Sequence, residues 1–278
     1  RLGNCACPSP TTGRVMDWNT LLVEDSGAGI FTLTLQRPEQ HNAMNLEMIR
    51  ELRNAFDELS GKASLRGLVL SGGNGPSFCA GGDLRWMQGN AQQPTEQRRA
   101  EARELAEMLA ALNDFPALTL ARINGAAYGG GLGLIACCDL AVAVETAQFA
   151  LTEVRLGLIP ATISPFVVGK LGGANSRRVM LHAKRFNAYE AQVLGLISDI
   201  AADLEALDQA ISRELKLLVK CAPEAVRTTK QLICTVENQA PETVREYTVK
   251  CLSETWETDS TREGVSAFFE KRRPEWAT

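Results

Sequence analysis

Two glycine-rich stretches constrain the fold of this chain more than any other feature of its sequence. Residues 78–87 read FCAGGDLRWM, and residues 125–134 read GAAYGGGLGL. Each stretch follows a short apolar segment that is typical of a buried strand, and each leads into a segment that favours a helix. The order of strand, glycine turn and helix therefore occurs twice, at residues 64–90 and at residues 117–140.

The segments around these stretches predict a mixed α/β core. Residues 29–38 alternate apolar and polar side chains and predict a strand that ends at Pro38. Residues 46–59 carry an apolar stripe at helical spacing, with Asn45 as the expected N-cap, and residues 95–113 form a second amphipathic pattern. Strand signals fade from about residue 165, so the last third is expected to be a helical layer on an α/β core.

The N-terminal residues differ from the rest. Residues 1–15 are polar, rich in Pro and Gly, and lack a core-forming period, whereas the foldable pattern begins beside Met16. We therefore expect a disordered or non-native extension at 1–15, a core with the active site at 16–200, and a helical region at 201–278 that either caps this core or meets another subunit.

Composition excludes several classes of protein. The net charge of −4 argues against nucleic acid or an anionic membrane as a partner, and no apolar run reaches the roughly 20 residues that cross a bilayer. Two histidines, His41 and His182, argue against a His-based metal site. Eight cysteines without a C-x-x-C pair, most of them in apolar contexts, indicate buried reduced thiols in a cytoplasmic protein.

Glycine turns that open helices can bind negative charge. Without a Cβ, backbone N–H groups approach a ligand closely, and the first turn of a helix has donors without internal partners. Two converging turns can hold one oxygen between two N–H groups, and each donor to a developing oxyanion lowers a barrier by roughly 3–4 kcal/mol. The alternative is that both turns simply connect strands to helices.

Other chemistries fit less well. Residues 131–136 match a G-x-G-x-x-A dinucleotide fingerprint, but Glu145 follows Gly131 by about 14 residues instead of roughly 20. Nucleophile-elbow, Walker and H-E-x-x-H motifs are missing from the sequence. Cys79 has no histidine near it in sequence, so a small residue in a tight turn explains it better than a nucleophile does.

Three motifs in order resemble the enoyl-CoA hydratase/isomerase (crotonase) family: FCAGGDL, NGAAYGGGLGLIACCDLAVA and ALTEVRLGLIPATISPF. The resemblance covers about residues 17–278. It implies an α/β crotonase (ClpP-like) fold of repeated β-β-α units with a helical C-terminal region. It also implies homotrimers that commonly pair into hexamers, and an acyl-CoA substrate whose coenzyme A is part of the substrate, with no separate cofactor and no metal.

The resemblance also assigns catalytic positions. The backbone N–H groups of Gly82 and Gly130 are expected to hold the thioester oxygen of the substrate. Typical family hydratases use two glutamates; here the position of the first is Gly133, and the second is Glu153. Glu153 is therefore the expected acid/base, although the number of carboxylates alone does not choose between a hydratase and an isomerase.

Contacts to the coenzyme A portion follow from the same likeness, and the segment around DLRWMQGNAQQPTEQ is expected to line the acyl pocket. For Phe268 and Lys271, the alternative is an ordinary helix end with cations at its C-terminus. The residues expected to contact coenzyme A are Arg37, Ala43, Ala80, Asp83, Leu84, Phe268 and Lys271.

A narrower likeness concerns the substrate. GGGLGLIACCD followed by LTEVRLGLIPATISPFV is similar to bacterial hydratases of 3-methylglutaconyl-CoA in leucine breakdown and of isohexenylglutaconyl-CoA in acyclic terpene breakdown. Both substrates carry a second carboxylate, for which Arg155 is the candidate ligand because arginine binds carboxylates bidentately; a surface salt bridge is the alternative. The sequence thus predicts a hydratase of a 3-branched glutaconyl-CoA, with an enoyl-CoA isomerase or a non-catalytic acyl-CoA-binding protein as alternatives.

Overall fold

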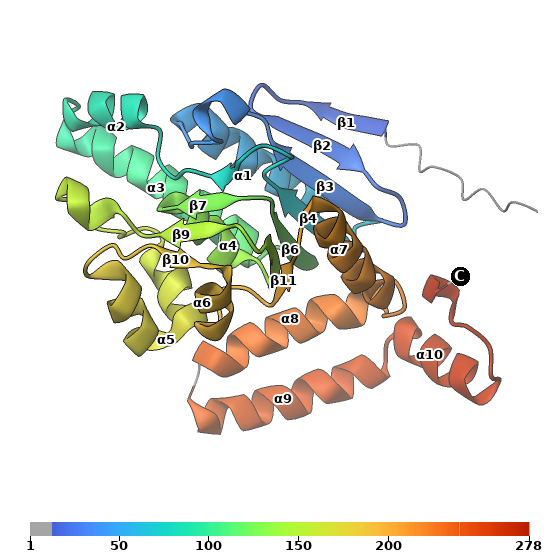
Figure 1. Ribbon diagram of the computed structural model, residues 1–278. Helices are drawn as coiled ribbons and strands as arrows, with labels where there is room; N and C mark the ends of the chain where they lie inside the picture. Colours follow the sequence, from blue (N-terminus) through green and yellow to red (C-terminus); the bar gives the residue numbers. More distant parts are fainter. Residues whose placement is uncertain (1–12, 239, 278) are drawn as a thin grey trace, which may run out of the picture.

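The larger of two sheets forms the centre of the computed structural model, which describes residues 13–238 and 240–277 (Figure 1). Its seven strands follow the order β1-β2-β3-β4-β6-β8-β11; β1 to β3 pair antiparallel and β3 to β11 pair parallel. Parallel strands buried on both faces are expected to be almost continuously apolar, as in GLVLS of β4. The bounds are β1 Gly13–Asp17, β2 Leu21–Asp25, β3 Ile30–Leu35, β4 Gly67–Ser71, β6 Leu118–Ile123, β8 Leu140–Val144 and β11 Asp199–Ala201.

A second, smaller sheet carries the ends of the repeated units. Its order is β10-β9-β7-β5, in which β5, β7 and β9 run parallel and β10 pairs antiparallel with β9. The bounds are β5 Ser77–Cys79, β7 Ala126–Tyr128, β9 Gln148–Ala150 and β10 Phe186–Asn187. Strands β5, β7 and β9 each follow one main-sheet strand after a short connection and lead on to helices, so the unit predicted twice occurs three times.

Helices cover the sheets and form the C-terminal layer. The side chain of Asn45 accepts a hydrogen bond from the Met48 N–H, so the predicted N-cap is confirmed. The helices are α1 Leu46–Ser60, α2 Leu84–Ala91, α3 Thr95–Asn113, α4 Gly130–Cys137, α5 Ser164–Met180, α6 Ala188–Val193, α7 Leu204–Leu218, α8 Pro223–Asn238, α9 Pro241–Trp256 and α10 Asp259–Phe269, with 3-10 turns η1 Pro38–Gln40, η2 Glu153–Leu156 and η3 Glu275–Ala277.

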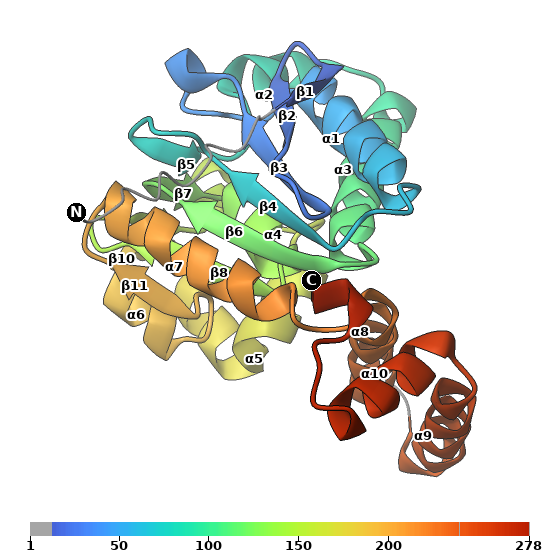
Figure 2. The same ribbon diagram turned by 90° about the vertical axis from the view of Figure 1, so that its right-hand side faces the viewer.

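The last three helices of the helical region lie to one side of the sheets. Helices α8, α9 and α10 pack on one another at one end of the molecule, far from α2 in both views (Figures 1 and 2). By contrast, α4 is buried along almost its whole length between α3, α5 and strands of the small sheet. No helix of the described ranges has the length and apolar character needed to cross a membrane.

Three details differ from the sequence expectations. Residues 13–15 belong to strand β1, which pairs with β2, and residues 1–12 of the expected extension lie outside the described residues. Two short strands, β10 and β11, follow residue 165. They were not expected, because a strand of two or three residues shows no alternating pattern. The boundary expected between residues 200 and 201 falls inside β11.

The cysteines are less uniformly buried than their contexts suggested. Cys79, Cys137 and Cys138 are buried free thiols, whereas Cys221 and Cys234 are exposed and Cys251 is half-buried. The expectation of burial is wrong for these last three, because the helical region forms a thin layer whose outer faces meet solvent in the single chain. The cytoplasmic location stays a prediction.

Candidate active site

The first glycine turn links strand β5 to helix α2. Gly81 has φ +90°, a value that favours glycine, and Asp83 caps the helix by accepting from the N–H groups of Arg85 and Trp86. The turn is held against residue 44 by two backbone hydrogen bonds: the Met44 N–H donates to the Gly81 oxygen at 2.7 Å, and the Asp83 N–H donates to the Met44 oxygen at 2.9 Å. Gly82 lies between these two anchored residues.

The second glycine turn links strand β7 to helix α4. Gly129 has φ +47° and ψ −117°, and its N–H donates to the Ala150 oxygen of β9 at 2.9 Å. No side chain caps α4, and Gly130 is its first residue. The N–H of Gly130 therefore lies in the first turn, where helical N–H groups have no partner within the helix.

Parallel pairing of β5 with β7 brings the two turns together. Equivalent ends of neighbouring parallel strands meet at one sheet edge, and here Cys79 pairs with Ala127. A Cβ built on Gly81 would lie 2.8 Å from the Tyr128 oxygen and 3.4 Å from the Gly130 nitrogen, so only glycine allows this approach. Among the hydrogen bonds of the described residues, none uses the N–H of Gly82 or of Gly130.

Glu153 lies against the second turn. It begins η2, directly after β9, and its Oε1 would lie 3.0 Å from a Cβ built on Gly129. Its Oε2 is buried and has no hydrogen-bond partner among the described residues. Burial raises the pKa of Glu153, and a hydrogen bond from its own backbone N–H opposes that effect only in part. A partly desolvated carboxylate without a cation partner is typical of a group that exchanges protons.

The residues expected to contact coenzyme A separate into two groups. Arg37, Ala43, Ala80, Asp83 and Leu84 lie on or beside the first turn. Of these, Arg37 and Asp83 form an ion pair at 2.9 Å with both side chains mostly buried, and Arg37 also donates to the Ala43 oxygen. The charge of Arg37 is therefore compensated within the chain, whereas Leu84 is exposed.

The second group lies far from the turns. Phe268, at the end of α10, is 78% exposed, and Lys271 follows it at φ +55°. Helix α10 and helix α2 lie at opposite ends of the molecule (Figure 1). Within one chain, the structure therefore does not bring Phe268 and Lys271 to the glycine turns.

Arg155 shares the one-turn helix η2 with Glu153. Its side chain is exposed, and one guanidinium nitrogen, Nη2, donates to the Ala183 oxygen at 2.9 Å. This bond fixes the direction of the side chain and leaves its other N–H donors for a ligand or solvent.

Three side chains near the turns were not predicted individually from the sequence. The Met87 sulfur would lie 3.0 Å from a Cβ on Gly82, and the Met44 methyl group lies where a Cβ on Gly130 would project. Trp86 packs near Gly82 and donates its indole N–H to the buried Glu101 of α3 at 2.8 Å. Met87 and Trp86 belong to the segment expected to line the acyl pocket; Met44 is far away in sequence and gave no local signal.

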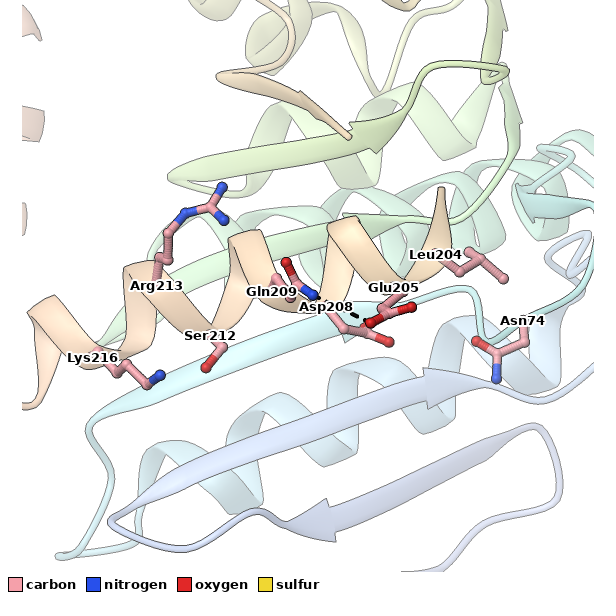
Figure 3. A pocket seen from close by; sticks show the side chains of 8 residues that line it. All are labelled: Asn74, Leu204, Glu205, Asp208, Gln209, Ser212, Arg213 and Lys216. Atoms are coloured by element: carbon pink, nitrogen blue, oxygen red, sulfur yellow. Dashed lines mark hydrogen bonds between the residues drawn. The ribbon is translucent and has the colours of Figure 1, made fainter. Parts of the chain in front are cut away.

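A separate hollow of about 820 Å³ lies along α7 (Figure 3). It is lined by Leu204 and by polar and charged side chains of α7 as far as Lys216, together with Asn74. None of the residues predicted for the site lines it. The convergence of two open N–H groups and a partly buried carboxylate identifies the glycine turns, and not this hollow, as the candidate active site.

Comparisons with known proteins concern the family of this chain and its fold. Residues 25–278 match the sequence model of a family described as Enoyl-CoA hydratase/isomerase. The chain is 31% identical over 255 residues to a putative enoyl-CoA hydratase of Thermus thermophilus, covering 91% of this chain and 99% of that protein. It is 28% identical over 270 residues to a peroxisomal Delta(3,5)-Delta(2,4)-dienoyl-CoA isomerase of Arabidopsis thaliana, covering 92% and 96%.

A solved structure, Pseudomonas aeruginosa AtuE, superposes with a TM-score of 0.90 at 38% identity, covering 94% of this chain and 100% of that one. The expected crotonase fold with its helical C-terminal region is thereby confirmed.

Proposed function

The chain belongs to the enoyl-CoA hydratase/isomerase family, and from that premise we propose that it is a hydro-lyase that adds water across the double bond of a 3-branched glutaconyl-CoA. The observation that carries the proposal is the position of Glu153: a buried, unpartnered carboxylate oxygen beside the turn that offers the Gly130 N–H. A protein that only bound acyl-CoA would have no need for a desolvated carboxylate at this place.

The proposed chemistry uses the two turns and one carboxylate. The N–H groups of Gly82 and Gly130 hold the thioester oxygen, and they bind it more strongly as it gains enolate charge. Glu153 takes a proton from water while the hydroxide adds to the β-carbon, and the same carboxyl group then returns the proton to the α-carbon. The net reaction adds one water molecule. General acid–base catalysis of this kind accelerates a reaction roughly a hundred- to ten-thousand-fold.

Substrate contacts follow from the exposed residues near the turns. The second carboxylate of a glutaconyl chain pairs with the free donors of Arg155, and the coenzyme A moiety follows the first turn along Ala43, Ala80, Asp83 and Leu84. Arg37 supports this contact indirectly, by fixing Asp83.

A homotrimer or a dimer of trimers would let Phe268 and Lys271 reach the site of a neighbouring subunit. The exposed apolar side chains of α9 and α10, among them Leu252, Trp256 and Phe269, support an interface there.

An enoyl-CoA isomerase is the second candidate, and one observation favours it: Gly133 supplies no second carboxylate. One acid/base suffices to move a proton between the α- and γ-carbons. A relative described as a dienoyl-CoA isomerase shows that the family includes that chemistry.

Kinetics with several thioesters test the proposal. We expect 3-methylglutaconyl-CoA or isohexenylglutaconyl-CoA to lose its conjugated-thioester absorbance with uptake of water, and Glu153→Gln to slow this reaction by at least about a hundredfold. Conjugation that appears from a β,γ-unsaturated thioester, without hydration, identifies an isomerase. Binding without turnover of any thioester rejects both enzymes, and full turnover by Glu153→Gln rejects the proposed role of Glu153.

Replacement of Arg155 tests the substrate class. We expect Arg155→Ala to raise KM for glutaconyl-type thioesters about tenfold or more, since a charged hydrogen bond is lost. Crotonyl-CoA lacks the second carboxylate and serves as the control substrate. Equal changes in KM for both substrates contradict the proposed role.

A further inference from the structure

Gly133 lies on α4 three residues after Gly130, so the two positions share a face of the helix. The fold leaves no space at position 133 for the Cβ atom of a side chain. A Cβ built there would lie 2.5 Å from Cγ2 and 3.0 Å from Cβ of Ile163, and 3.5 Å from a methyl carbon of Leu109. Carbon atoms in contact normally lie about 3.5–4.0 Å apart.

Ile163 itself is held firmly in this place. It is 2% exposed, it immediately precedes α5, and its oxygen accepts from the Val167 N–H at 3.0 Å. Isoleucine is branched at Cβ and has few alternative side-chain positions, so it cannot swing aside without moving the backbone. Ile163 also ends the connection that Glu153 begins, which places the carboxylate and this apolar side chain on one segment against α4.

We propose that Ile163 excludes a second acid/base group from this site: its side chain occupies the space that a side chain at position 133 would need, and so keeps Glu153 as the group that both accepts and returns the proton. The inference rests on the proposed function and deepens it. The absence of a carboxylate at position 133 is then matched by the packing, because the space beside Gly133 is filled with hydrocarbon.

Thermal unfolding of a set of variants tests the steric part. We expect Gly133→Ala to lower Tm by roughly 5 °C in the natural chain, as overpacking does. In an Ile163→Ala background, where Cγ2 is gone and only the 3.0 Å contact with the Cβ of residue 163 remains, the same Gly133→Ala change should lose most of this penalty. Since Ile163→Ala alone is itself destabilising, the penalty is read as the difference in Tm between the double variant and Ile163→Ala, which requires that the single variant folds.

Matched controls make the test specific. Ile163→Val keeps Cγ2 and should leave Gly133→Ala destabilising; it also serves if Ile163→Ala does not fold, because loss of the penalty in this background contradicts the geometry. A Cβ on Gly131 would meet the backbone oxygen of Cys79, so Gly131→Ala should remain destabilising with Ile163→Ala. Gly169 of α5 has open space, so Gly169→Ala should not lower Tm.

Activity tests the chemical part. We expect Gly133→Glu with Ile163→Ala to hydrate crotonyl-CoA at least about tenfold faster than Ile163→Ala alone, because a second acid/base becomes available. A stable Gly133→Ala in the natural chain, additive Tm changes, or no gain from the added glutamate overturns the proposal. Failure of the proposed function is distinguishable: it would appear as no turnover by the natural protein, while the Tm coupling would persist.

Discussion

The two glycine turns have similar sequences and occupy equivalent places in the fold, yet they differ in electrostatics. After the first turn, Asp83 accepts from the N–H groups of Arg85 and Trp86, and Arg37 neutralises Asp83. After the second turn, no side chain caps α4. Among the described residues, the positive end of α4 therefore has no side-chain partner, whereas that of α2 is already satisfied by the protein.

The helices that follow the two turns also differ in how firmly they are packed. Helix α2 has no buried residue, whereas every residue of α4 after Gly130 is buried. A helix with few buried contacts opens and shifts more readily than one packed on all sides. The comparison indicates a second turn that leads into a fixed helix, and an anchored first turn that leads into a helix able to form an adaptable wall.

The largest effect is expected at Gly129. Its φ and ψ suit only glycine, and a methyl group there would touch the Glu153 carboxylate. We expect Gly129→Ala to lower kcat/KM by about a hundredfold or more, because the second turn can no longer hold both Glu153 and the Gly130 N–H in place.

The control is Gly27→Ala, at φ +84° with open space around the position. Both variants share backbone strain of about 1–3 kcal/mol, but only Gly129→Ala should lose turnover. Equal values of kcat/KM in the two variants would contradict a special role of the second turn in turnover.

The next effect concerns pH. Because burial raises the pKa of Glu153, the acid limb of kcat/KM should lie above the usual titration range of glutamate, and Glu153→Gln should abolish that limb together with most of the activity. A limb at the ordinary glutamate value contradicts the role of Glu153 as a desolvated base.

Glu153→Gln should change the stability of the protein in the opposite direction to its activity. A carboxyl group whose pKa is raised in the folded state adds stability below its unfolded pKa, and this stability is lost as pH rises through the folded value. At neutral pH, Glu153→Gln should therefore have a higher Tm than the natural chain, and the difference should shrink on acidification. Thermal melts of both proteins from pH 4 to pH 8 measure it.

The smallest effect is expected at the first turn. Burial would raise the pKa of Asp83, but hydrogen bonds from Arg37 and from the N–H groups of Trp86 and Arg85 outweigh it and lower the pKa. Asp83→Ala removes the cap and should cost about 1 kcal/mol of stability at neutral pH. Asp83→Asn keeps an N-cap acceptor and should lose less stability. Its remaining loss comes mainly from the broken ion pair with Arg37.

The sign for Asp83 is the reverse of that for Glu153. A lowered pKa in the folded state gives stability above the unfolded pKa, which is lost as pH falls through the folded value. The Tm difference between Asp83→Ala and the natural chain should therefore narrow in acid. A difference that grows in acid would contradict the ion pair.

Much of the fold could be predicted from local patterns. The helix at residues 95–113, the N-cap Asn45 and the helix after the second glycine turn are confirmed, because periodicity and capping depend on residues close in sequence. Strands β10 and β11 could not be predicted, since two or three residues carry no period. Met44 and Ile163 could not be predicted as neighbours of the glycines, since both contacts depend on packing between distant segments.

What the sequence by itself determined is the backbone chemistry: two turns that only glycine allows, each between a strand and a helix, and a glutamate in a motif that follows them. Only the tertiary structure decided how these parts act. Parallel pairing of β5 with β7 placed the turns at one sheet edge, Asp83 closed one helix end while the other stayed open, and Ile163 filled the space beside Gly133. The reason is that short-range propensity fixes torsions, whereas burial, charge pairing and excluded volume arise only when remote segments meet.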